Sequence, residues 1–106
     1  MNNTEFKQMS WQERVKFAAK AEITADVLNL CLEDCADVIV SVLLRGEVQF
    51  SMEQQHYCLK HYDPWVRVAA LKREDFLIPQ HYLEQSKQSQ YKLEQFAAIE
   101  KQRSQQ

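Results

Sequence analysis

Cysteine and histidine are the residue types in this chain best suited to chemistry. Cys31 and Cys35 stand four residues apart, so a helix would place both thiols on one face. His56, Cys58 and His61 add soft or borderline metal ligands in a later segment. A zinc site made by Cys31, Cys35, Cys58 and His61 is one hypothesis. Structural zinc modules use paired Cys-x-x-Cys spacings, which are missing here, so we favour cysteines buried as apolar side chains and assign neither a metal nor another cofactor.

Catalysis by one of these cysteines would also need a histidine within reach and a site that stabilises an oxyanion. Glycine-rich loops commonly build such sites, and Gly46 is the only glycine in the chain. The sequence also lacks a phosphate-binding glycine loop and a His-Glu-x-x-His motif. We therefore predict that the protein is not an enzyme.

Aromatic and basic residues gather between His56 and Arg73. Trp, Tyr and Arg dominate binding hot spots because they combine a large rigid area with a polar tip. The predicted partner-binding residues are Tyr57, Lys60, Tyr62, Trp65, Arg67, Lys72 and Arg73. The alternative is that Trp65 and Tyr57 fill the seam between packed helices while the charged groups stay solvated.

The charges are unevenly distributed although the formal net charge is only -2. Residues 22–53 carry seven acids against Arg45 alone, and residues 56–73 carry four Lys/Arg residues against Asp63 alone. Lys60, Arg67, Lys72 and Arg73 are the cations that a nucleic acid would contact. This set is too small, and the chain too acidic, to make nucleic acid the favoured partner.

The composition favours helices. One glycine and two prolines leave little material for the tight turns of an all-β fold, so the predicted class is all-α. No apolar run reaches the ~20 residues that cross a bilayer, and the first residues do not resemble a signal peptide. We expect a cytoplasmic protein with reduced thiols and without membrane contact.

Capping signals mark four helix starts. Ser10 with Glu13, and Ser51 with Gln54, have capping-box spacing. Thr24 is a cap for a helix that should end near Cys35, and Asp63 with Pro64 begins a helix that should reach Lys72. The helix after Ser10 should extend from Trp11 to about Lys20.

Two segments are less clear. Residues 38–44 are rich in β-branched residues and fit a buried strand by propensity, but Asp37 precedes them as Asp63 precedes the later helix, which favours a helix. Pro79 should open one last helix reaching at least Ile99, although residues 84–90 are wholly polar and interrupt its apolar stripe.

The helices repeat at a short interval. Val15, Val40 and Val66 are 25 and 26 residues apart, and each begins a helix, a polar loop and a second helix. Repeats of this length stack, and about three are needed for stability. Residues 66–71 (VRVAAL) with 78–83 (IPQHYL), and residues 14–20 with 23–28, resemble leucine-rich repeat variants and, more loosely, HEAT repeats. The resemblance implies stacked helix pairs that bind protein.

We therefore predict a short stacked helix-pair array of about three units with a longer C-terminal helix. Residues 1–85 would form the repeat-like domain, and residues 86–106 a C-terminal extension that is an end cap or partly frayed. Leu93, Phe96 and Ile99 in this extension would be buried by a second copy, by another protein or by folding back.

The predicted function is a non-catalytic protein–protein interaction module, either an adaptor or a small inhibitor of a larger complex. The sequence does not specify the protein partner, and a homodimer through the C-terminal helix is a further option. The alternatives are a metal-stabilised regulatory protein and a weak nucleic-acid binder.

Overall fold

A computed structural model describes residues 2–106, which form eight α-helices and no strand. The all-α prediction, with a longer C-terminal helix, is confirmed. The helices group into two compact units, one ending at Val48 and the other Gln49–Gln106. A separate domain boundary at residue 85 stays a prediction, and residues 86–106 lie within the second unit. No helix in residues 2–106 is long and apolar enough to cross a membrane.

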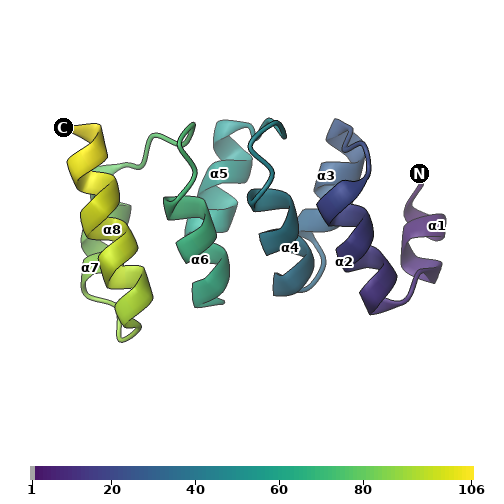
Figure 1. Cartoon of the computed structure of the whole chain (residues 1–106), viewed down its shortest axis with the longest axis horizontal. Coiled ribbons are helices and arrows are strands. Elements are labelled where there is room, and N and C mark those ends of the chain that lie inside the picture. Colours follow the sequence, from purple (N-terminus) through teal and green to yellow (C-terminus); the bar gives the residue numbers. More distant parts are fainter. Residues whose placement is uncertain (1) are drawn as a thin grey trace. The chain divides into compact units, whose positions relative to one another are not determined.

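The first unit contains four helices (Figure 1): α1 (Asn3–Gln8), α2 (Trp11–Lys20), α3 (Ala25–Leu32) and α4 (Ala36–Leu43). Helix α4 packs against both α2 and α3. Its buried side chains are Val38, Ile39, Val42 and Leu43. Helix α1 has no counterpart among the sequence predictions, although its Asn2 cap, which accepts a hydrogen bond from the Glu5 amide, is a common start signal.

The second unit also contains four helices: α5 (Met52–Leu59), α6 (Pro64–Leu71), α7 (Gln80–Lys87) and α8 (Lys92–Gln105). Helix α6 packs against α5 and α8, and α8 packs against α7 as well. Figure 1 shows α6 and α8 side by side, each beginning at the lower end of the unit. The turns Lys60–Asp63 and Gln88–Tyr91 therefore lie at one end, and the segment after Leu71 lies at the other.

The predicted caps are confirmed. Both hydrogen bonds of each capping box form, between Ser10 and Glu13 and between Ser51 and Gln54. Thr24 Oγ1 accepts a hydrogen bond from the Val27 amide, and Asp63 Oδ1 accepts one from the Trp65 amide at 2.8 Å. Polar side chains thus fix these helix starts by satisfying amides that have no partner within the helix.

The β-branched run 38–44 is helical up to Leu43, as predicted, but two local expectations about this region are wrong. The N-cap of α4 is Cys35, and Asp37 lies in the first turn, so it is not the equivalent of the Asp63 cap. Helix α3 ends at Leu32 rather than near Cys35. Asp34 explains the early end, because its Oδ1 accepts a hydrogen bond from the Cys35 amide at 2.7 Å and shapes the turn into α4.

The single C-terminal helix expected after Pro79 is two helices. Pro79 is the N-cap of α7, which ends at Lys87, and α8 begins at Lys92. In the intervening turn, Ser89 Oγ accepts a hydrogen bond from the Tyr91 amide, and the Ser89 carbonyl accepts one from Gln95 Nε2. The polar run 84–90 was the sequence signal for this break, because it contains the turn that lets α8 fold back on α7.

Helix spacing in the structure differs from the predicted repeat. Helices α4, α6 and α8 begin at Ala36, Pro64 and Lys92, at intervals of 28 residues. Val38 of α4 therefore corresponds to Val66 of α6, and the predicted match of Val40 with Val66 is two residues out of register. The resemblance to leucine-rich repeat variants stays a prediction.

Candidate interaction surface

An aromatic cluster surrounds the turn between α5 and α6. The rings of Tyr57 and His61 meet edge to face with centroids 6.0 Å apart, and the His61 and Tyr62 rings stack at 4.4 Å. Trp65 follows on the first turn of α6. We call Tyr57, Tyr62 and Trp65 the aromatic surface.

The three side chains of the aromatic surface are open to solvent. Tyr57 is 44% exposed, Trp65 59% and Tyr62 85%. The alternative in which Tyr57 and Trp65 fill a seam between helices is therefore wrong. Large aromatic groups exposed side by side are typical of surfaces that bind another molecule.

Arg67 and Glu94 hold the turn beneath the aromatic surface. The Arg67 guanidinium makes two hydrogen bonds to the Glu94 carboxylate, of 2.7 and 2.8 Å, and thereby joins α6 to α8. It also donates to the carbonyls of His61 and Tyr62 at 2.7 and 3.0 Å. Arg67 thus shapes the turn from below, and its predicted role as a direct partner contact gives way to a supporting one.

Glu94 is 2% exposed and is fully used by its neighbours. Its Oε2 also accepts a hydrogen bond from Ser86 Oγ at 2.9 Å. Burial alone would raise the pKa of Glu94, but hydrogen bonds from Arg67, Ser89 and Ser86 outweigh it and hold the pKa below its ordinary value. The carboxylate is therefore ionised at neutral pH, and the sequence analysis missed it because a Glu on a polar helix looks solvated.

His61 has a structural task within the same turn. Its Nδ1 accepts a hydrogen bond from the Asp63 amide at 3.0 Å, which requires that nitrogen to be unprotonated. Burial lowers the pKa of His61, in competition with nearby Asp63. A neutral imidazole therefore supports the stacked Tyr62 ring at neutral pH.

A polar pocket of about 310 Å³ opens beside Tyr62. Lys60, Tyr62 and Arg67 line one side, and Ser89 and Glu94 line the other. This volume is at the lower limit of small-molecule sites, which are typically ~300–1,000 Å³ and mostly apolar. The pocket is better suited to one polar side chain of a partner than to a cofactor.

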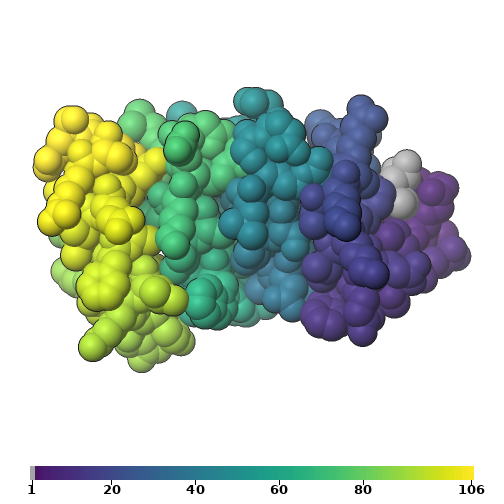
Figure 2. All heavy atoms as spheres, in the orientation of Figure 1, coloured from purple at the N-terminus to yellow at the C-terminus, as the bar shows by residue number. Residues whose placement is uncertain are grey.

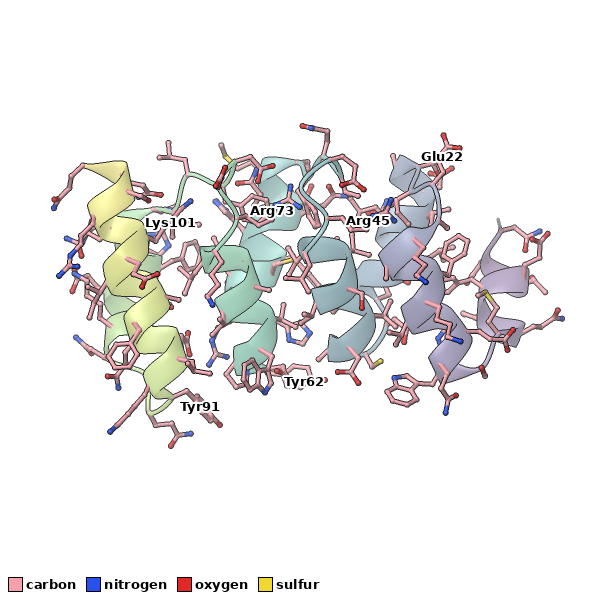
Figure 3. All side chains as sticks on the ribbon, viewed as in Figure 1. Glu22, Arg45, Tyr62, Arg73, Tyr91 and Lys101 are labelled. Atoms are coloured by element: carbon pink, nitrogen blue, oxygen red, sulfur yellow. The ribbon has the colours of Figure 1, made fainter. Side chains whose placement is uncertain are left out.

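Other predicted contact residues divide between the two ends of the second unit. Lys60 is exposed beside the aromatic surface, whereas Lys72 is exposed at the far end of α6, where it is the C-cap. Tyr91 is a residue that sequence reasoning missed. It is 44% exposed, and Figure 3 shows it at the same end of the unit as Tyr62. Its position 28 residues after Asp63 was the available signal.

Arg73 is not a surface residue, so its predicted role in partner binding is wrong. Its guanidinium is buried and lies over the rings of Phe50 and Phe76, 4.8 and 5.0 Å from their centroids. Asp75 accepts two hydrogen bonds from it, of 2.8 and 2.7 Å. Stacking and pairing of this kind stabilise the fold and leave little of the group for a partner.

Cations recur at the ends of helices in both units. Arg45, Arg73 and Lys101 are spaced 28 residues apart, and Figure 3 shows each near the upper end of its helix. In the first unit, Arg45 Nη1 donates to the carbonyls of Ala18 and Ala21 at the end of α2. In the second unit, Lys101 Nζ donates to the Arg73 carbonyl after α6 at 2.6 Å. Each cation meets a helix C-terminus, where unpaired carbonyls concentrate negative partial charge.

The cysteines do not form the hypothesised zinc site. No group of three or more His, Cys, Asp or Glu side chains suited to a metal occurs in residues 2–106. Cys31 and Cys58 are buried and free, and Cys35 is exposed and free. Burial raises the pKa of Cys31 to about 11, with a contribution from Asp34, and that of Cys58 to about 12. Both buried thiols stay protonated and serve as apolar packing groups.

Comparison with known proteins adds no relative. No protein-family model, curated protein or solved structure matches this chain.

Proposed function

We propose that the protein is a non-catalytic interaction module that binds a protein partner through the aromatic surface. The observation that carries this proposal is the exposure of Tyr57, Tyr62 and Trp65 around one short turn. Such side chains bury a large area when a partner covers them and lose few rotamers in doing so. Their tips keep a hydrogen-bonding group for orientation.

The rigidity of the turn supports the same proposal. Arg67 is bonded to Glu94 and to two turn carbonyls, and His61 is bonded to the Asp63 amide. A surface held in this way need not be ordered at the moment of binding, so less of the interaction energy is lost. Lys60 at the edge would favour acidic groups on the partner.

Occupancy alone would make such a module an adaptor or an inhibitor. The groups that might attack a substrate are engaged or protonated: burial raises the pKa of Cys31 and Cys58, and the Asp63 amide occupies His61 Nδ1. The free thiol of exposed Cys35 fits a reducing compartment, so we propose the cytoplasm as the place of action.

The rival functions gain no specific support. Two of the four cations expected to contact nucleic acid are used inside the fold, Arg67 by Glu94 and Arg73 by Asp75. Lys60 and Lys72 remain exposed at opposite ends of the unit. A metal-stabilised regulator would need ligands that the buried protonated thiols do not provide.

Photo-crosslinking in the source cell tests the proposal. A photoreactive phenylalanine analogue at Tyr62 should capture one protein at near-equal amounts, and the same analogue at Leu44 of the first unit should not. Adding Trp65→Ala should remove the captured protein, whereas the matched variant Trp11→Ala should keep it. Trp11 is 47% exposed, so both tryptophan variants should retain the helical circular dichroism of the original protein. Capture that ignores Trp65→Ala would overturn the proposal.

A further inference from the structure

Helix α8 carries a second exposed apolar stripe, away from the aromatic surface. Leu93 is 54% exposed, Phe96 56% and Ile99 39%. At 100° per residue these side chains lie on one arc of the helix, together with exposed Lys92, Glu100 and Arg103. Phe96 lies at the centre of this arc. We call it the α8 stripe.

The opposite face of α8 is the one that its own unit covers. Glu94, Ala97, Ala98 and Lys101 are buried there, against α6 and α7. In Figure 2 the atoms of α8 (yellow-green to yellow) lie on the near face of the second unit, and no other element of that unit covers them. The α8 stripe is therefore an apolar face without a partner inside its unit.

The order of residues along the stripe is self-complementary. Leu93 and Ile99 stand three residues before and after Phe96, and Lys92 and Glu100 stand four residues before and after it. An antiparallel copy centred on Phe96 would place Leu93 against Ile99 of the other chain and Lys92 against Glu100. A parallel copy would instead place like charges together, which is unfavourable. Antiparallel packing also pairs opposite ends of the two helix dipoles.

From this pattern we infer that two copies of the chain associate through the α8 stripe as an antiparallel, two-fold symmetric pair centred on Phe96. A two-fold contact presents the same surface from both chains, which a palindromic arrangement of apolar and charged residues satisfies. The inference is independent of the aromatic surface, which stays open for the partner proposed above.

The association should be weak. The stripe spans one helix of 14 residues, about 21 Å long, and such a contact is smaller than the interfaces of stable dimers. We expect a Kd on the order of 10 µM to 1 mM. Sedimentation velocity from about 10 µM to 1 mM of the full chain should show a reversible shift from monomer to dimer, and a monomer throughout would overturn the inference.

Substitutions on the stripe test its register. Phe96→Asp should weaken the dimer at least ~10-fold, because it puts two carboxylates at the two-fold axis. Lys92→Glu and Glu100→Lys should each weaken it a few-fold, and the double variant should restore it. An equimolar mixture of the two single variants should form a heterodimer, because opposite charges then face each other at both positions.

A matched control and a fold check complete the experiment. Leu77→Asp changes a 77% exposed apolar residue of the same unit outside the stripe and should leave the Kd unchanged. Circular dichroism should show the same helix content in every variant. A dimer insensitive to Phe96→Asp, or a double charge variant that stays as weak as the single ones, would show that another surface or register is used.

Discussion

In the first unit, Arg14 joins Asp34 and the Met9 carbonyl, and in the second unit Arg67 joins Glu94 and two turn carbonyls. The two units thus use the same device, an arginine fork that holds a carboxylate and a loop. Their surfaces differ. The first exposes two large apolar side chains, Trp11 and Leu44, whereas the second exposes nine. The comparison teaches that the second unit is the part of the protein built to be covered by another molecule.

The strongest test of this comparison removes each arginine. Arg67→Ala leaves the carboxylate of Glu94 buried and unpaired, which should lower the free energy of unfolding by about 3–5 kcal/mol. Arg14→Ala should cost less, about 1–3 kcal/mol, because Asp34 lies nearer to solvent and keeps the Cys35 amide as a donor.

Urea unfolding followed by circular dichroism measures both effects. Adding Glu94→Gln to the Arg67→Ala variant should recover part of the loss, because a neutral amide is less costly to bury than an unpaired charge. Equal losses in the two units would remove the distinction between them.

A second test compares the cations at the helix ends. Arg73→Lys should destabilise the fold by about 1–3 kcal/mol, because an ammonium group cannot stack between Phe50 and Phe76 while it binds both oxygens of Asp75. Arg45→Lys should cost under about 1 kcal/mol, since Lys101 already shows that a lysine can bind a helix-end carbonyl. Thermal melting of both variants checks the order, and a larger loss for Arg45→Lys would reverse it.

Acid should weaken the second unit through Glu94. Its pKa is lower in the folded protein than its ordinary value of 4.5, so it stabilises the fold above that pH, and this contribution is lost as pH falls through the folded pKa. Hydrogen exchange of α6 and α8 amides, read between about pH 5 and 3, should show increased opening. Glu94→Gln should make that opening less dependent on pH. In the first unit, the backbone and side-chain hydrogen bonds of Ser10 lower the pKa of Glu13, but this group is fully exposed and should matter little.

The mildest test leaves the fold unchanged. A thiol reagent at pH 8 should label one cysteine per native chain, Cys35, and three after unfolding. Cys31 of the first unit and Cys58 of the second are buried with raised pKa values, so both should be protected. Peptide mapping assigns the labelled residue, and rapid labelling of Cys58 alone would show that the second unit opens more readily than the first.

Local signals in the sequence predicted most of the fold. Caps at Ser10, Thr24, Ser51 and Asp63 placed four helix starts, because each depends only on residues two or three positions away. The break at Gln88–Tyr91 was not predicted, because it contains no glycine or proline and depends on Ser89 bonds and on packing between α7 and α8.

The candidate site was predicted only in part. Aromatic type and spacing identified Tyr57, Tyr62 and Trp65, which are exposed. Charge type alone could not separate Lys60, which is solvated, from Arg67 and Arg73, which are internal. Their partners Glu94 and Phe50 lie 27 and 23 residues away along the chain, beyond the range of local patterns.

The cations at helix ends also bear on how the chain forms during synthesis. Lys101 follows Arg73, whose carbonyl it binds, by 28 residues. At roughly 5–20 residues per second, the ribosome would deliver that lysine about 1–6 s after the end of α6 has been made. Helices form in microseconds, so α6 would exist well before its carbonyl finds this partner. Each new helix would thus complete the end of an earlier one, and the nascent chain would gain stability in steps from the N-terminus onward.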